Sequence, residues 1–326
     1  MISSFYAIGM LLVALSLRAI YGIYCGVHFK DCRFKFLYDK QLYLHLFSFT
    51  GWNVFGASAG ILNTYGINIL VNLFFGVSMN AARGIADQVS HAVNHFSGNF
   101  TMALSPQITK SFSSGDYAYT SLLIYRGAKY SALLLWFFGL PVILQVDYIL
   151  NLWLVEVPAY APVFVNLALL YSLCNALSLT LYYGILATGD IKAYHIVVTT
   201  INLMAFPICY IAFTCGYGAE WGYLSAIVSM LLSLVARGIM LKRKLPMFTL
   251  WDYTKDAFIK VVAVMVITYL LLYPINHFGI VSGFIQLLLI TAISVIVNGA
   301  IIYIIAIDAS EKAMLKKLSF ASRWRK

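Results

Sequence analysis

Nine long stretches of apolar residues, almost free of charge, are the feature that most constrains how this chain can fold. A helix that crosses the roughly 30 Å of bilayer hydrocarbon needs about 20 mainly apolar residues. Only 10% of the 326 residues are charged, whereas a soluble domain carries about a quarter. The sequence therefore predicts an all-α, polytopic membrane protein of about nine transmembrane helices, at residues 3–24, 43–76, 80–108, 123–147, 162–188, 193–214, 218–240, 257–274 and 280–306.

The second stretch is unusually long and rich in glycine. Gly51, Gly56, Gly60 and Gly66 recur through it. Glycine lowers helix stability, and irregular backbone is tolerated inside a bilayer only where it faces protein or a watery cavity. This pattern predicts a bent or broken helix.

The basic residues predict the orientation of the chain. All but three of the 22 Lys and Arg residues lie in or next to every second connection or in the C-terminal tail, with Arg126 and Lys129 assigned to the connection after the third span. Cytoplasmic loops carry the excess of Lys and Arg, so the N-terminus is expected outside and the C-terminus in the cytoplasm of a bacterial inner membrane. The net charge of +10 is then explained by topology and anionic lipid, without nucleic acid as a partner.

Three arginines fall inside the predicted spans. Arg18 and Arg237 lie within about two turns of a cytoplasmic end, where the side chain is expected to snorkel to the interface. Arg83 lies in the outer half of the third span, on the side that otherwise lacks positive charge. An intramembrane arginine costs about 2.5–3.5 kcal/mol on the insertion scale, so it normally faces a partner or a wet cavity.

Arg83 belongs to a polar stripe on its helix. At 100° per residue the stripe covers an arc of about 80° and contains Asn80, Arg83, Asp87, His91 and Asn94. Two interpretations remain open. The stripe either lines a cavity in which Arg83 binds an anionic group, or it contains an Arg83–Asp87 pair that only satisfies itself.

The second span adds several amides that suit the same cavity. Asn63, Asn68 and Asn72 lie among its glycines. Amide side chains in membrane helices join helices by hydrogen bonds, and they also suit sugar hydroxyls. Asn68 and Asn72 are therefore included with the stripe as candidate substrate-binding residues, while the packing role stays open.

Motifs of enzymes and metal sites are missing from the sequence. It has no HExxH, GxSxG, Walker loop or CxxC, and its five cysteines have no paired spacing. The predicted outer loops are short and hold no basic residue. We therefore expect a protein that is not an enzyme, with no catalytic residue, cofactor or metal.

Several motifs, in the right order, resemble the second half of polysaccharide (O-antigen) flippases. These belong to the superfamily of multidrug and toxin-extrusion (MATE) transporters. The resemblance rests on residues 48–53 (SFTGWN), 80–86 (NAARGIA), 105–112 (SPQITKSF), 152–158 (LWLVEVP) and 187–192 (ATGDIK).

This resemblance implies a function and a domain plan. Such flippases have two six-helix lobes that rock about a cavity and pass polyprenyl-diphosphate-linked oligosaccharide across the inner membrane for lipopolysaccharide biosynthesis, and Arg83 matches a cavity arginine that faces the diphosphate. Here the front of the family pattern is missing, which suggests a truncated chain that needs an N-terminal lobe or polysaccharide assembly proteins as partners. The implied parts are 1–27 (last helix of the missing lobe), 28–42 (amphipathic linker), 43–245 (C-terminal lobe) and 246–326 (two extra helices and a basic tail).

Two other functions remain open at this stage. A drug/cation antiporter of the same superfamily would place a carboxylate at the centre of the cavity. An O-antigen polymerase or ligase would be a membrane enzyme, and such enzymes usually need a large external loop.

Overall fold

The computed structural model describes residues 2–29, 38–277, 283–308 and 311–312, and all regular elements in these ranges are helices. Two of the elements, η2 and η3, are π-helical. The elements are α1 (Ile2–His28), α2 (Lys40–Phe75), α3 (Val77–Ser113), α4 (Tyr117–Leu144), α5 (Val146–Trp153), α6 (Ala161–Ala187), α7 (Lys192–Leu203), α8 (Ala205–Thr214), α9 (Trp221–Lys244), α10 (Leu250–Tyr253), η2 (Thr254–Ile259), α11 (Lys260–His277), α12 (Phe284–Ile301) and η3 (Ile302–Ala306).

Eight stretches of the described residues are long and apolar enough to cross a membrane. They correspond to eight of the nine predicted spans. The ninth, at residues 80–108, is the 37-residue helix α3, which is more polar and does not belong to these eight. The membrane character and the all-α class predicted from the sequence are thus present, and α3 is set apart by the side chains it carries.

The chain divides into two compact units, Met1–Ser48 and Phe49–Lys326. The first contains α1 and the start of α2, and the second contains all later elements. The unit boundary falls inside α2. Most of the predicted linker 28–42, namely residues 30–37, and most of the basic tail lie outside the described residues.

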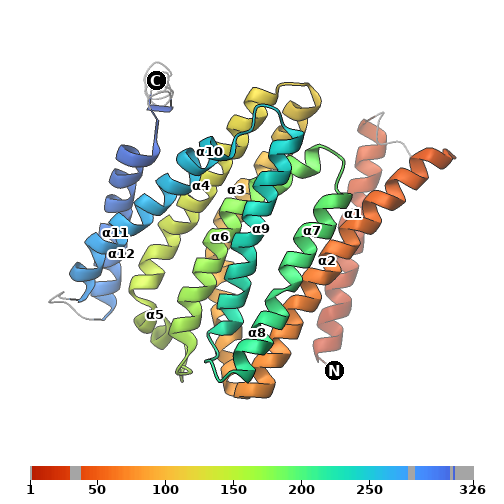
Figure 1. The fold of residues 1–326 in the computed structure, drawn as a ribbon. Coiled ribbons are helices and arrows are strands. Elements are labelled where there is room, and N and C mark those ends of the chain that lie inside the picture. Colours follow the sequence, from red (N-terminus) through yellow and green to blue (C-terminus); the bar gives the residue numbers. More distant parts are fainter. Residues whose placement is uncertain (1, 30–37, 278–282, 309–310, 313–326) are drawn as a thin grey trace. The chain divides into compact units, whose positions relative to one another are not determined.

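The second unit is built around α6, which contacts α3, α4 and α9 extensively, and α3 also packs on α4 (Figure 1). Their core includes the fully buried side chains of Phe164, Leu169 and Leu181 from α6. Helices α11 and α12 pack on α4, where Trp136 Nε1 donates a hydrogen bond to Thr268 Oγ1 at 2.9 Å. Helices α7 and α8 pack on α9 instead.

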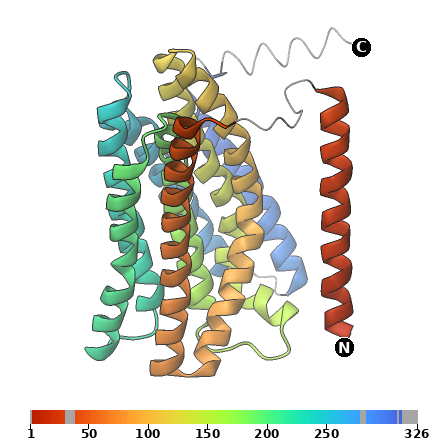
Figure 2. The same cartoon turned by 90° about the vertical axis from the view of Figure 1, so that its right-hand side faces the viewer.

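A tight turn joins α2 to α3 at one end of the bundle (Figure 2). Gly76 is the single residue between them and has a φ of 85°. This left-handed conformation is cheap only for glycine. The turn therefore reverses the chain, and α3 begins directly at the end of α2.

Helix α2 is continuous from Lys40 to Phe75, so of the two predicted alternatives, bent or broken, the broken helix is wrong. Two of its glycines have a different role, which is close packing. A Cβ atom at Gly56 would lie 2.4 Å from His195 Nδ1 of α7, and one at Gly66 would lie 2.8 Å from Phe206 Cδ2 of α8. These glycines let α2 approach α7 and α8 without interrupting the helix.

Exchanging Gly56 for alanine tests this packing role. We expect Gly56→Ala to lower the free energy of unfolding by about 1–3 kcal/mol, because the added methyl group overpacks the contact with His195. A Cβ atom at Gly60 would meet nothing within 4 Å. Gly60→Ala should therefore be neutral or stabilising by up to about 1 kcal/mol, since alanine is the better helix former. Denaturant titrations in detergent micelles measure both variants, and equal stabilities would contradict the packing role.

A break does occur in a different predicted span, residues 193–214. The chain turns at Met204, between α7 and α8, and Met204 N bonds to the carbonyls of both Thr200 and Ile201. Pro207 is the third residue of α8 and has no N–H to donate to the carbonyl of Leu203. Irregular backbone was predicted at the glycines of α2. It lies between α7 and α8 instead, because Pro207 has no N–H to continue the helical hydrogen bonds.

A buried cluster of charges holds the end of η3 against α4. Lys129 Nζ, on a side chain that is only 2% exposed, lies 2.9 Å from Glu311 Oε2 and 2.8 Å from the carbonyl oxygen of Ala306. Arg126 Nε lies 2.9 Å from Glu311 Oε1. The assignment of Arg126 and Lys129 to a basic loop is therefore wrong, because both lie well inside α4 and are neutralised by an acidic partner.

The cluster continues onto η2 and α11. Lys260 Nζ lies 2.6 Å from Asp308 Oδ1 and 3.0 Å from Asp256 Oδ1. Partial burial acts to raise the pKa of Asp308 and Glu311, but their bonds to Lys260, to Lys129 and to the backbone N–H of Asp308 outweigh it. Both pKa values are therefore lower than usual.

Candidate functional site

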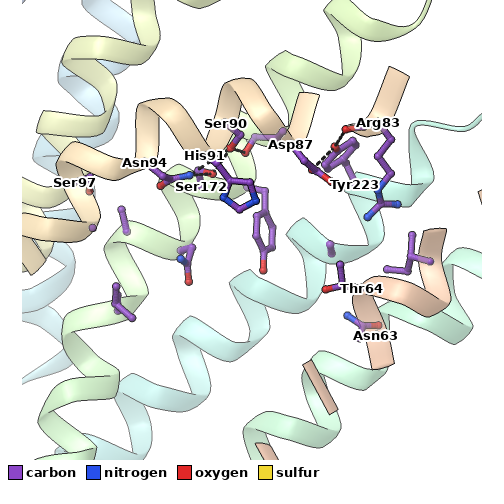
Figure 3. A pocket seen from close by; sticks show the side chains of 18 of the residues that line it. Asn63, Thr64, Arg83, Asp87, Ser90, His91, Asn94, Ser97, Ser172 and Tyr223 are labelled. Atoms are coloured by element: carbon purple, nitrogen blue, oxygen red, sulfur yellow. Dashed lines mark hydrogen bonds between the residues drawn. The ribbon is translucent and has the colours of Figure 1, made fainter. Parts of the chain in front are cut away.

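A polar cavity of about 430 Å³ lies among α2, α3, α6 and α9 of the second unit (Figure 3). Helix α3 contributes more lining residues than any other helix, and α2 faces them from across the cavity. Its polar lining residues are Asn63, Thr64, Arg83, Asp87, Ser90, His91, Asn94, Ser97, Thr101, Tyr171, Ser172, Asn175 and Tyr223.

Arg83 contributes a buried cation to this cavity. The residue is 6% exposed, and its Nε and Nη1 atoms have no hydrogen-bond partner among the residues that the structure describes. Its guanidinium carbon lies 4.9 Å from the centre of the Tyr223 ring. A cation–π contact contributes about 0.5–2 kcal/mol, whereas leaving a charge buried without a partner costs several kcal/mol. The ring alone therefore does not compensate the charge.

Asp87 has a partner other than Arg83. Tyr223 Oη donates a hydrogen bond to Asp87 Oδ1 at 2.7 Å, and no ion pair joins Asp87 to Arg83 in the described part of the chain. Figure 3 shows the Tyr223 side chain between the two. The interpretation of Arg83 and Asp87 as a self-satisfied ion pair is thus not what the structure contains.

Gly222 makes room for the guanidinium. A Cβ atom at this position of α9 would lie 3.0 Å from Arg83 Nη1 and 3.3 Å from Val71 Cγ2. These separations are tighter than ordinary van der Waals contact. The absence of a side chain at Gly222 thus leaves the space that the Arg83 guanidinium occupies beside Tyr223.

Neutral polar groups continue the wall along α3. Asn94 Nδ2 donates to Ser172 Oγ at 2.6 Å, and Ser90 Oγ and Ser172 Oγ lie 2.8 Å apart. Ser97 Oγ donates to the carbonyl of Ser131 at 2.8 Å. From Arg83 to Thr101 these residues extend about 27 Å along the helix axis, at 1.5 Å per residue. The wall therefore carries Arg83 and Asp87 near one end and, beyond them, His91 with amides and hydroxyls.

Four of the seven predicted site residues line the cavity, namely Arg83, Asp87, His91 and Asn94. Asn80, Asn68 and Asn72 do not. Asn80 lies one turn before Arg83, beyond the end of the cavity. Asn63 does line it, and Asn72, nine residues later, points about 180° away around α2 and is exposed.

Several residues that line the cavity were not predicted from the sequence. Ser90, Ser97 and Thr101 share the face of α3 that carries Arg83, so a longer search with the helical period would have included them. Tyr171, Ser172 and Asn175 come from α6, and Tyr223 comes from α9. These helices are apolar on several sides, so their sequences do not indicate which face lines the cavity. That face is determined by how they pack around the cavity with α3.

The comparisons with known proteins give no further assignment. No family model, curated protein or solved structure matches this chain. Among the described residues, no group of three or more His, Cys, Asp and Glu side chains could hold a metal ion. A functional assignment for this chain therefore rests on the geometry of the cavity.

Proposed function

We propose that this cavity binds the anionic group of a lipid-linked oligosaccharide and that the chain takes part in moving that lipid across the bacterial inner membrane. The observation that carries the proposal is Arg83, a buried guanidinium with two unpartnered nitrogens at the wall of a polar cavity. A planar guanidinium suits phosphate oxygens, because it can donate two parallel hydrogen bonds. Its unmet donors are those that a diphosphate would fill.

The rest of the wall suits the sugar. Sugar hydroxyls both donate and accept hydrogen bonds, and so do the amides and hydroxyls of Asn63, Asn94, Asn175, Ser172 and Tyr171. Six helical segments, α2, α3, α4, α6, α7 with α8, and α9, would form the lobe that carries this wall. Together with the motif resemblance, this arrangement favours a flippase of the MATE-like type, with α3 as a ninth membrane span.

The same proposal includes a mechanism and a topology. Transport would proceed by alternating access without covalent chemistry, and the N-terminus would lie outside and the C-terminus inside. A cation antiporter is less well supported, because the only carboxylate that lines the cavity in the described residues, Asp87, already accepts a hydrogen bond from Tyr223. Its capacity to hold a cationic drug is reduced accordingly.

Binding of a soluble lipid diphosphate tests the proposal. Farnesyl diphosphate is titrated into the purified chain in detergent, and the affinity of the cavity site is measured. A hydrogen bond to a charged group contributes about 1.5–3 kcal/mol, so Arg83→Gln should weaken this affinity by roughly 10- to 100-fold.

The control for this experiment is Arg18→Gln. Arg18 is an exposed arginine of α1 that does not line the cavity. Its loss changes the net charge equally and should leave the affinity unchanged. Unaltered binding in Arg83→Gln, or an equal loss in both variants, would rule out a specific role for Arg83.

A further inference from the structure

A second buried arginine lies on the same helices as the cavity, at the other end of α9. Arg237 is 7% exposed, although it is only seven residues from the end of α9 at Lys244. The expectation that this side chain snorkels to the interface is therefore wrong. Its Nη1 donates to Ser178 Oγ of α6 at 2.8 Å, and its Nε is buried with no partner.

Aromatic rings surround this guanidinium. Its carbon lies 5.7 Å from the centre of the Tyr182 ring of α6 and 5.8 Å from that of Tyr194 of α7. No ion pair between Arg237 and a carboxylate occurs in the ranges that the structure describes. The hydroxyls of Ser178 and Tyr194 both bond to Arg237, but neutral hydroxyls and ring faces compensate a buried charge only partly. The described residues therefore surround the Arg237 cation without supplying a counter-charge.

The helical period connects Arg237 to the cavity. Ala226 of α9 lines the cavity, and Arg237 follows 11 residues later, about 20° away around the helix. On α6, Asn175 lines the cavity and Tyr182 follows 7 residues later, also about 20° away. The faces of α6 and α9 that form the cavity wall therefore continue to Arg237.

We propose that Arg237, with Ser178, Tyr182 and Tyr194, forms a second binding site for a phosphate or diphosphate group, and this inference rests on the proposed function of the Arg83 cavity. Tyr223, which contacts Arg83, and Arg237 are 14 residues apart, or about 21 Å along α9. Hydrocarbon in a bilayer is about 30 Å thick, so the two arginines lie toward opposite ends of the path across it. A transported anion would meet one arginine near each end.

The number of bound anions tests this inference. Inorganic pyrophosphate is titrated into the purified full chain by calorimetry, and we expect two equivalents to bind. Arg83→Gln and Arg237→Gln should each remove one equivalent, and the double variant should remove both. Far-UV circular dichroism and gel-filtration elution confirm that each variant is folded.

Arg237→Lys serves as a second variant, because it keeps the buried charge and loses the planar fork. It should weaken the second equivalent by at least about tenfold, and the first should be unchanged. This variant keeps the test decisive if Arg237→Gln does not fold. An undiminished second equivalent in Arg237→Lys would overturn the inference.

The phosphate could belong to a membrane lipid instead of the transported molecule. Phosphatidylglycerol that copurifies with the wild type and is lost in Arg237→Gln would identify the lipid head group as the source. Loss of a pyrophosphate equivalent without a change in bound lipid would identify the transported group. Either result supports the site, and no change in both would overturn it.

The outcomes separate the two proposals. A single equivalent that only Arg83→Gln removes would overturn the Arg237 site and leave the proposed cavity function standing. A single equivalent that only Arg237→Gln removes would overturn the proposed cavity function and leave the Arg237 site standing. Absence of any bound pyrophosphate and of any bound lipid would overturn both.

Discussion

Replacing Lys129 by methionine is expected to lower the free energy of unfolding by about 3–5 kcal/mol, because it leaves Glu311 without its fully buried cation. Methionine fills much of the same space and cannot donate to Glu311 or to the carbonyl of Ala306. Arg126 remains within 2.9 Å of Glu311, but its own side chain is partly exposed and compensates less. Denaturant titration of the chain in detergent micelles measures the change.

Two further variants control this experiment. Lys110→Met removes an exposed lysine of α3 that has no ion pair among the described residues, and it should change stability by no more than about 0.5 kcal/mol. The double variant Lys129→Met/Glu311→Leu replaces the whole pair by apolar groups and should recover most of the loss. A double variant as unstable as Lys129→Met would contradict an account based on an unpaired charge.

The same cluster predicts how stability depends on pH. The pKa values of Asp308 and Glu311 are lowered in the folded chain, so folding favours their ionised forms. Their contribution is present above the unfolded pKa of about 4 and is lost as the pH falls through the lower folded values. Unfolding midpoints should therefore be flat above about pH 5 and fall in more acidic solution, less steeply in Glu311→Gln.

Replacing Arg83 by methionine is expected to have opposite effects on stability and on transport. The buried guanidinium lacks partners at Nε and Nη1, so its removal should raise the free energy of unfolding by about 1–3 kcal/mol. Transport of lipid-linked oligosaccharide should fall by more than about 100-fold, because the diphosphate loses its charged donor. The substitution is introduced into the chromosomal gene. Transport is then measured in these cells as the amount of lipid-linked oligosaccharide that reaches the outer leaflet.

Asp87→Asn is the matched variant for this prediction. Asparagine keeps the oxygen that accepts the hydrogen bond from Tyr223, so stability should change by less than about 1 kcal/mol. Transport should fall less than in Arg83→Met, since the substrate supplies its own negative charge. A destabilised Arg83→Met protein with normal transport per molecule would show that Arg83 has only a structural role.

Much of the fold could be predicted because a membrane-spanning helix requires a long stretch of apolar residues, which is visible in the sequence. Apolar length predicted the helices, closely for α6 (161–187 against the predicted 162–188) and less closely for α4, which begins at Tyr117 instead of residue 123. The errors came from local backbone chemistry. Two of the glycines of α2 face neighbouring helices, as Gly56 faces His195, and this depends on contacts that a single helix does not reveal.

The candidate site was predictable only on the helix that carries most of its polarity. The period of 3.6 residues placed Arg83, Asp87, His91 and Asn94 on one face of α3, and they line one cavity. Tyr223 was not found, because nothing in its apolar surroundings on α9 marks it. Arg237 was misread because distance from a helix end says nothing about which neighbours cover a side chain.

The interruption at Met204 affects how strain is distributed through the bundle. Continuous helices transmit bending along their whole length, whereas α7 and α8 are joined where one ladder hydrogen bond cannot form. Ala205, Cys209 and Phe213 of α8 are buried against α2, while Tyr194 of α7 lies over Arg237. The joint is therefore the point of this segment where the helical hydrogen-bond ladder is weakest, and it lies between the seam of α8 with α2 and the contact of Tyr194 with Arg237.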